Sequence, residues 1–256
     1  MGEIMMNNKI KILKNFIKES ENIVFFGGAG VSTESGVPDF RSKDGLYNQR
    51  DIKFEKYTPE YLLSHTCLVR DTEVFYEYYR QKMDARGVEP NITHKVLAKW
   101  EEEGKLSAVV TQNIDGLHQK AGSKCVYELH GTTLRNYCNS CNKEYKSDYI
   151  FESKEYIPRC QCGGIVRPFV TLYEEGLPED AVQGAINTIS NADMLIIGGT
   201  SLKVYPAASY IQYFKGKHLV VINREELGVR LNMNDDLFIC GSLGEVFKEL
   251  YKEDIG

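Results

Sequence analysis

The sequence lacks an apolar stretch of membrane-spanning length, and it lacks an excess of basic residues. Its longest apolar runs, such as residues 194–197 and 219–222, fall far short of the ~20 residues that a membrane-spanning helix needs. The 256 residues include 31 lysines and arginines against 36 aspartates and glutamates, a net charge of −5. Without surplus positive charge, the chain cannot hold a phosphate backbone through counterion release. Both a membrane protein and a nucleic-acid-binding protein are therefore disfavoured.

Targeting signals, internal repeats and a paired cysteine framework are also missing. The N-terminal residues fit neither a myristoylation site nor a signal peptide. The seven cysteines are unevenly spaced, and an odd number cannot all pair within one chain. With 42% hydrophobic residues the chain can bury a core, which excludes disorder. We expect a folded, soluble, cytoplasmic protein and a monomer.

Short apolar or β-branched runs alternate with stretches of helical length. The runs cover residues 23–26, 108–111, 194–197, 219–223 and 237–240. Apolar strands of this kind are buried on both faces, as in a parallel sheet with helices on each side. A helical stripe of Ile10, Leu13 and Ile17 precedes the first run, and Asn91 and Pro206 are placed to open later helices. The pattern predicts an α/β fold with a doubly wound parallel sheet.

Four of these strands end in small or polar residues. The four segments are residues 27–30, 111–116, 198–201 and 223–225. In open α/β sheets, ligands bind beyond the carboxyl ends of the strands. Ordinary turn chemistry explains any single segment, but four together predict one binding site at this edge.

The first of these segments is a glycine-rich loop. Gly28-Ala29-Gly30, between a strand and a helix, lets the backbone approach a pyrophosphate and aim amide N–H groups at it. The dinucleotide fingerprint has a third glycine where this chain has Thr33, and the acidic Asp51 follows a loop instead of a second strand. The loop therefore predicts nucleotide binding without ordinary hydride-transfer architecture.

Four motifs of this chain closely resemble those of the sirtuin family. They are Gly28-Ala29-Gly30-Val31-Ser32, Ser35-Gly36-Val37-Pro38-Asp39-Phe40-Arg41, Thr111-Gln112-Asn113-Ile114-Asp115 and His130-Gly131. The resemblance runs from about residue 22 to residue 240 in the family's order. It implies a Rossmann-like NAD-binding domain of residues 1–40, 86–133 and 166–256. Residues 41–85 and 134–165 would form a smaller inserted domain, made of a helical module and a zinc ribbon.

Four cysteines crowd together in the middle of the chain. Cys138 and Cys141 form one closely spaced pair, and Cys160 and Cys162 form another. Two such hairpins predict a tetrahedral Zn²⁺ site, although a single residue between the second pair is unusual. Four sulfur ligands leave no open position, so the metal would be structural. The alternative is a reduced pair with two stray thiols.

Among five histidines, His130 has a special context. It follows the strand-like residues 126–129 and precedes Gly131, where the insert meets the main sheet. An imidazole takes up a proton near neutral pH. By resemblance, His130 is the general base of NAD⁺-dependent lysine deacylation, which yields free lysine, nicotinamide and O-acyl-ADP-ribose. We expect His94 and His118 to be helix-surface or packing residues.

The resemblance also implies the residues that bind the cofactor. Asp115 is expected at the nicotinamide amide, Gln112 at the ribose hydroxyls and Phe40 over the reacting carbon. Asn113 lies near the reacting ribose and is a second catalytic residue. The other residues expected to contact NAD are Gly28, Ala29, Gly30, Thr33, Asp39, Arg41, Ile114, Gly199, Thr200, Ser201, Asn223, Arg224 and Cys240.

In this family the acylated peptide lies extended between two strands, and residues 170–173 and 202–205 match those places. The matching contact residues are Val170, Leu172, Tyr173, Val204 and Tyr205. Relatives often show aromatic-Gly-Glu where this chain has Tyr173-Glu174-Glu175, and Phe169 is unexpectedly apolar. Members that prefer acidic acyl groups carry a Tyr-x-x-Arg pair that residues 77–80 lack, which favours acetyl or another neutral acyl group.

Two other functions remain compatible with the sequence. Mono-ADP-ribosyl transfer to protein would use the same NAD pocket. A zinc ribbon could also dock nucleic acid or protein, although its basic residues are balanced by acidic ones.

Overall fold

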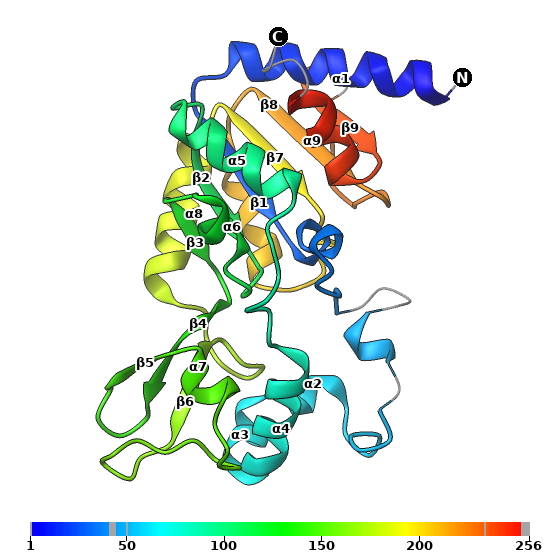
Figure 1. Cartoon of the computed structure of the whole chain (residues 1–256). Coiled ribbons are helices and arrows are strands. Elements are labelled where there is room, and N and C mark those ends of the chain that lie inside the picture. Colours follow the sequence, from blue (N-terminus) through cyan, green and yellow to red (C-terminus); the bar gives the residue numbers. More distant parts are fainter. Residues whose placement is uncertain (1, 41–44, 50, 233, 252–256) are drawn as a thin grey trace.

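The computed structural model describes residues 2–40, 45–49, 51–232 and 234–251, and it contains a large and a small unit (Figure 1). The large unit is built on a six-stranded sheet of order β3-β2-β1-β7-β8-β9. Its strands are β1 Ile23–Gly27, β2 Leu106–Thr111, β3 Val126–Glu128, β7 Met194–Gly198, β8 His218–Asn223 and β9 Leu237–Cys240. All neighbouring pairs are parallel. The predicted α/β class and its parallel sheet are confirmed.

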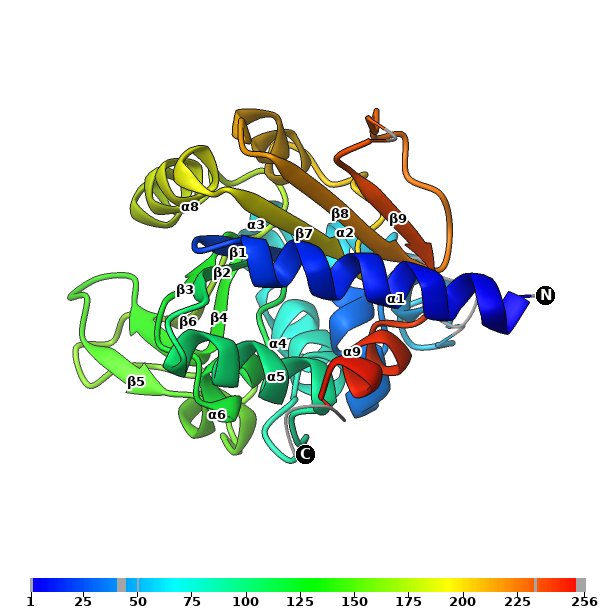
Figure 2. The same cartoon turned by 90° about the horizontal axis from the view of Figure 1, so that it is seen from above.

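Helices cover both faces of this sheet because its strands are apolar on both sides. On one face lie α1 Gly2–Glu19, α5 Ile92–Glu102 and α9 Leu243–Tyr251, whose side chains pack around Phe25 (Figure 2). On the other face, α8 Glu179–Asn191 packs around Phe26. Successive residues of β1 therefore belong to opposite cores. Between β2 and β3 lies the short helix α6 Leu117–Ala121.

Asn91 caps α5 as predicted, because its side chain accepts a hydrogen bond from the Thr93 amide at 3.0 Å. Pro206 opens a helical segment, but Ala207–Tyr213 forms a 3₁₀ helix instead of an α-helix. Among the residues that the structure describes, none of the helices combines the length and apolar character needed to cross a bilayer.

The small unit combines a second sheet with a group of helices. Strands β4 Gly131–Cys138, β5 Glu144–Lys146 and β6 Val166–Val170 form an antiparallel sheet of order β5-β4-β6. Helices α2 Pro59–Leu62, α3 His65–Arg70, α4 Thr72–Lys82 and α7 Asp148–Phe151 belong to the same unit. Their core includes Phe75, Tyr76, Tyr79 and Ile150.

The expected boundary between residues 165 and 166 falls at the start of β6, which pairs with β4 in the small sheet. Three short 3₁₀ helices, Ala29–Val31, Thr33–Ser35 and Leu46–Asn48, precede the helical group along the chain. The expected division of the chain into domains stays a prediction.

Candidate functional site

A cavity of about 700 Å³ opens at the carboxyl ends of β1, β2, β7 and β8. The structure brings together residues from all four polar strand-end segments, namely Ala29, Gly30, Gln112, Asn113, Gly199, Thr200, Ser201, Asn223 and Arg224. Thr33, Asp39, Phe40 and His130 also line its wall. Such a position at the strand ends is the usual place for a ligand in an open α/β sheet.

Close backbone approach explains the glycines of the first loop. A Cβ on Gly30 would lie 2.8 Å from the Gly199 Cα, and Gly199 itself has φ +58. The Gly30 amide donates to the Gly199 carbonyl at 2.7 Å, and the Gly28 amide donates to the Gly198 carbonyl at 3.3 Å. These two amides hold the loop to β7, and the expected contact of the loop with a phosphate stays a prediction.

Polar groups nevertheless remain for a nucleotide in this cavity. Among the described residues, the Ala29 amide has no hydrogen-bond acceptor, unlike its glycine neighbours. Arg224 and Lys203 add positive charge to the wall. The cavity volume, the Ala29 amide and these two cationic side chains fit a ligand that carries phosphates and hydroxyls.

A smaller cavity of about 110 Å³ adjoins the first and shares Ala29, Phe40 and Asn113 with it. Ile114 and Asp115 lie on its wall. The Asp115 carboxylate accepts hydrogen bonds from the Ser32 hydroxyl at 2.7 Å and from the Leu117 amide at 2.9 Å. Burial raises the pKa of Asp115. The small cavity therefore offers a positioned acceptor beside an apolar wall.

His130 lies on the wall of the large cavity, and a main-chain hydrogen bond orients its ring. Its Nδ1 atom lies 2.8 Å from the Gln112 carbonyl oxygen. Because a carbonyl oxygen only accepts, Nδ1 carries the hydrogen, and the neutral ring keeps its lone pair on Nε2. The next residue is Gly131 at φ +73, where a Cβ would lie 2.2 Å from the Phe169 carbonyl oxygen. Only glycine fits the turn that places this imidazole.

Two other histidines form a buried pair away from the cavity. The rings of His94 and His118 lie 4.7 Å apart, and both side chains are buried. Of the two roles expected for these histidines, the packing role is confirmed and the helix-surface position is wrong. Desolvation lowers the pKa of His94 to about 4 and that of His118 to about 3.

Some predicted cofactor contacts lie outside the cavity lining, and other lining residues were not predicted. Gly28 packs against Thr200, and the exposed Cys240 directs its thiol to the Arg224 carbonyl. Arg41 lies outside the described residues. Lining residues that sequence reasoning missed are Glu34, Lys203, Ile222, Glu225, Gly241, Ser242 and Leu243. Several directly adjoin a predicted segment, and that adjacency is the signal that could have found them.

The two segments expected to flank a peptide are not both strands. Val170 ends β6, whereas residues 171–173 and 202–205 lie outside the strands. Leu202 at φ 52 and Glu174 at φ 76 interrupt the extended backbone. The Thr171 amide donates to the His130 carbonyl at 2.9 Å. Val204 lines the large cavity, and Tyr205 is exposed beside it in the sequence.

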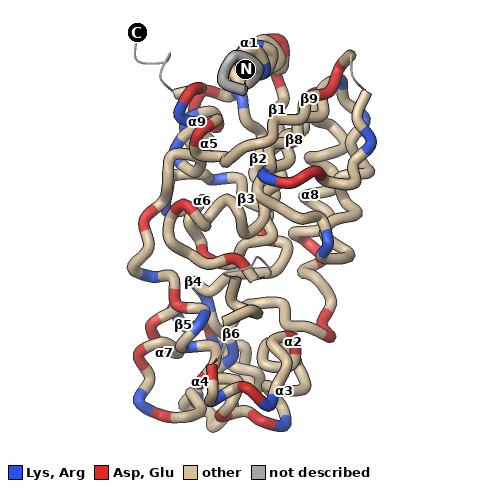
Figure 3. Tube along the Cα trace, turned by 90° about the vertical axis from the view of Figure 1, so that its right-hand side faces the viewer, with Lys and Arg blue, Asp and Glu red and all other residues tan. Residues whose placement is uncertain are grey.

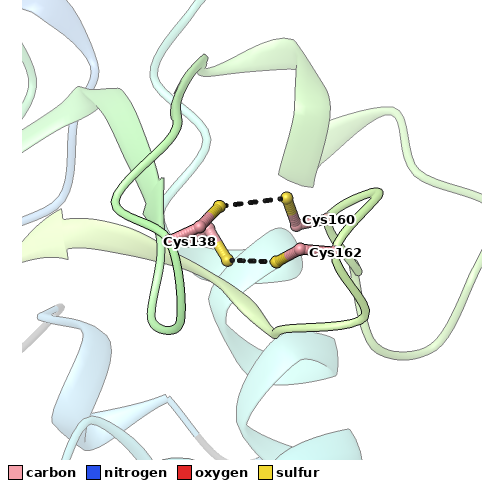
Figure 4. A group of neighbouring side chains, drawn as sticks. Cys138, Cys160 and Cys162 are labelled. Carbon is pink, nitrogen blue, oxygen red and sulfur yellow. Dashed lines mark hydrogen bonds between the residues drawn. The ribbon is translucent and has the colours of Figure 1, made fainter.

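The four clustered cysteines form a site that fits a tetrahedral metal (Figure 4). The Cys138 and Cys162 sulfurs lie 3.5 Å apart, those of Cys141 and Cys160 lie 3.6 Å apart, and all four lie within 4.8 Å of one another. Zn–S bonds of about 2.3 Å require sulfur separations of about 3.8 Å, far beyond a disulfide bond. A backbone hydrogen bond from Cys162 lowers the pKa of Cys160 to about 6, which favours a thiolate ligand. The donor set fits a structural Zn²⁺.

A parallel sheet with a nucleotide-sized cavity at its strand ends, next to a four-cysteine module, defines a nucleotide-binding α/β protein with a structural metal site. The model of the Sir2 family matches residues 28–206. The chain belongs to the Sir2 family, as the sequence motifs indicated.

Relatives and solved structures agree with this membership over nearly the whole chain. The chain is 53% identical over 246 residues to an NAD-dependent protein deacetylase of Clostridium acetobutylicum, covering 96% of this chain and 99% of that protein. A Clostridium perfringens protein of the same name is 55% identical over 244 residues, covering 94% and 98%. A structure of Sir2 bound to acetylated peptide has a TM-score of 0.82 at 33% identity, covering 96% of this chain and 98% of that one.

Proposed function

We propose that this protein is an NAD⁺-dependent protein-lysine deacetylase that yields free lysine, nicotinamide and O-acetyl-ADP-ribose. The observation that carries the proposal is the His130 imidazole, oriented by the Gln112 carbonyl on the wall of the 700 Å³ cavity. Similarity to named deacetylases over 94% or more of the chain supports the same reaction. Its protein substrates carry acetylated lysine.

NAD⁺, when bound, supplies the ADP-ribosyl group that accepts the acetyl group. His130 takes up a proton at Nε2, because its Nδ1–H already donates a hydrogen bond to the Gln112 carbonyl oxygen. Gln112 and Asn113 line the cavity beside it and offer side-chain amides to hydroxyl groups. Asn113 also donates to the Ser32 hydroxyl at 3.0 Å, which links it to the Asp115 carboxylate.

The smaller cavity suits the nicotinamide ring. Asp115 would accept from the ring's amide there, and Ile114 would pack beside it. Phe40 lines both cavities and is placed to exclude water where they meet. Ala29, Gly30, Thr33, Thr200, Ser201 and Asn223 would hold the phosphates and adenosine, with Arg224 and Asp39 beside them.

The acyl-lysine peptide would lie along residues 170–173 and 202–205, with contacts to Val170, Leu172, Tyr173, Val204 and Tyr205. A neutral acyl group is favoured because Arg80 is not available for an acidic one. Its guanidinium donates to the carbonyls of Ile150, Glu155 and Tyr156. Acetyl is therefore the acyl group that we propose.

The composition and surface charge also support the remaining expectations. Basic and acidic residues are interspersed along the trace (Figure 3), which does not favour a nucleic-acid partner. All seven cysteines are free of disulfide bonds, as expected in a reducing cytoplasm. The cytoplasmic location and the monomeric state stay predictions.

Mass spectrometry of an acetyl-lysine peptide, incubated with the enzyme with and without NAD⁺, tests the proposal. We expect deacetylated peptide and O-acetyl-ADP-ribose only when NAD⁺ is present. Addition of an ADP-ribosyl group to a protein, without loss of acetyl, would instead support mono-ADP-ribosyl transfer through the same cavity. An unchanged peptide in both samples would overturn the deacetylase assignment.

A further inference from the structure

A hydrogen bond joins two segments of the site that lie far apart in the sequence. The hydroxyl oxygens of Tyr47 and Tyr173 are 2.7 Å apart, although the residues are separated by 126 positions. Tyr47 belongs to the 3₁₀ helix Leu46–Asn48, and Tyr173 lies in the segment that follows β6. The two hydroxyls thus connect the segment next to Phe40, called the cofactor side, with residues 170–173, called the peptide side.

On the cofactor side, Tyr47 is fixed to Phe40. The Tyr47 amide donates to the Phe40 carbonyl at 2.9 Å, and the Leu46 amide donates to the Asp39 carbonyl at 2.7 Å. The rings of Phe40 and Tyr47 meet edge to face with centroids 5.5 Å apart. Since Phe40 and Asp39 line the large cavity, the position of Tyr47 sets part of the cavity wall.

On the peptide side, Tyr173 is anchored by its own backbone. Its amide donates to the Leu63 carbonyl at 3.0 Å, and its carbonyl accepts from the His65 amide at 3.0 Å. The next residue, Glu174, adopts φ 76, and its carboxylate accepts from the Thr66 amide and hydroxyl at 2.9 and 2.7 Å. These bonds compensate the unfavourable backbone conformation and hold the segment against α3.

The same segment reaches the proposed base at its other end, because the Thr171 amide donates to the His130 carbonyl. An unbroken path of contacts therefore runs from His130 through residues 171–173 to Tyr47 and on to Phe40. Both ends of this path line the large cavity.

We propose that the Tyr47–Tyr173 hydrogen bond couples binding of the acylated peptide to binding of NAD⁺, with both tyrosines acting as positioning residues. This inference rests on the proposed deacetylase function. A peptide that lies along residues 170–173 further restrains Tyr173 in the position that bonds Tyr47, and so favours the matching position of Phe40. Because coupling between two sites is reciprocal, NAD⁺ strengthens peptide binding by the same factor.

The test removes each hydroxyl while keeping each ring, in Tyr47→Phe, Tyr173→Phe and the double variant. Deacetylation rates are measured over a grid of NAD⁺ and acetyl-peptide concentrations, and NAD⁺ affinity is measured by calorimetry without peptide. Loss of one hydrogen bond should raise the KM for NAD⁺ at saturating peptide about two- to tenfold. We expect a smaller effect on kcat, a smaller loss of NAD⁺ affinity without peptide than with it, and a double variant no worse than either single one.

Tyr156→Phe is the matched control, because Tyr156 is largely exposed and belongs to neither segment. It should leave all these quantities unchanged. If the wild type is active, an unchanged KM for NAD⁺ in both single variants would overturn the coupling. Additive effects of the two substitutions in the double variant would overturn it as well. An equal loss of NAD⁺ affinity with and without peptide would also overturn it. A wild type without any deacetylation would overturn both the coupling and the proposed function.

Discussion

The Nδ1 atom of His130 lies 2.8 Å from the main-chain carbonyl oxygen of Gln112. Gln112 directly follows β2, and its own amide donates to the Gly27 carbonyl at the end of β1 at 3.0 Å. The orientation of the imidazole therefore depends on the central strands of the large sheet. Side-chain substitutions around the cavity leave this main-chain acceptor in place.

Replacing His130 with alanine should reduce deacetylation about 100- to 10,000-fold, the usual contribution of a general base. The imidazole is half-buried on the cavity wall, so its loss should leave the melting temperature nearly unchanged. Product formation by mass spectrometry and melting by circular dichroism measure the two effects. Wild-type rates in a folded His130→Ala variant would contradict the assignment.

Asp115→Asn should impair recognition of nicotinamide far more than that of adenosine. The Asp115 carboxylate accepts from Ser32 and from the Leu117 amide, and an asparagine side chain keeps the shape but loses one acceptor atom. Loss of a charge-assisted hydrogen bond predicts a rise of about ten- to a hundredfold in the KM for NAD⁺. ADP-ribose, which lacks nicotinamide, is the internal control and should bind with unchanged affinity. An equal loss for both ligands would count against this role.

Cys138→Ser should release the metal and unfold the small sheet. Three sulfurs and a hydroxyl make a much weaker zinc site, and residues 142–159 are rich in charge and poor in apolar side chains. Metal analysis should fall from about one zinc per chain to almost none. Cys125→Ser is the matched control, because Cys125 lies outside the cluster. Unchanged zinc content in Cys138→Ser would refute the ligand set.

The buried pair of His94 and His118 should make the fold sensitive to acid. Their pKa values, lowered to about 4 and about 3, lie below the ordinary value of 6.5, so the unfolded chain binds more protons between these limits. The contribution of this pair to the free energy of unfolding should therefore be fully present above pH 6.5 and should be lost as the pH drops toward 3. The slope should be at most about 1.4 kcal/mol per pH unit for each histidine.

Urea unfolding across this pH range measures the effect, and His118→Gln should flatten the slope. Glutamine cannot take up a proton in this range, so the proton uptake that His118 contributes on unfolding is lost. The same slope in wild type and variant would show that the pair does not control acid stability.

The sequence predicted those features that depend on local pattern. Apolar runs predicted β1, β2, β7, β8 and β9 because a strand buried on both faces needs apolar residues throughout. The spacing of Cys138, Cys141, Cys160 and Cys162 predicted the cluster because metal ligands of a hairpin must be close in sequence.

Other features depend on tertiary contacts that no local pattern encodes. The backbone bends at Leu202 and Glu174, so residues 202–205, which match one of the family's two peptide-flanking strands, do not form a strand. The pairing of His94 with His118 depends on how α5 packs against α6. The bond between Tyr47 and Tyr173 needs two segments that meet only in the folded chain. The cofactor and peptide contacts expected of individual residues stay predictions.

Strand β4 begins at Gly131, directly after His130, and ends at Cys138. A single strand of eight residues thus has the proposed base before one end and a zinc ligand at the other, with no linker between them. Chelation of the metal would consequently disturb the alignment of the imidazole even though zinc takes no part in the chemistry. Zinc starvation of a cell would therefore reduce the activity of such an enzyme, while leaving the large sheet and the loops at its strand ends intact.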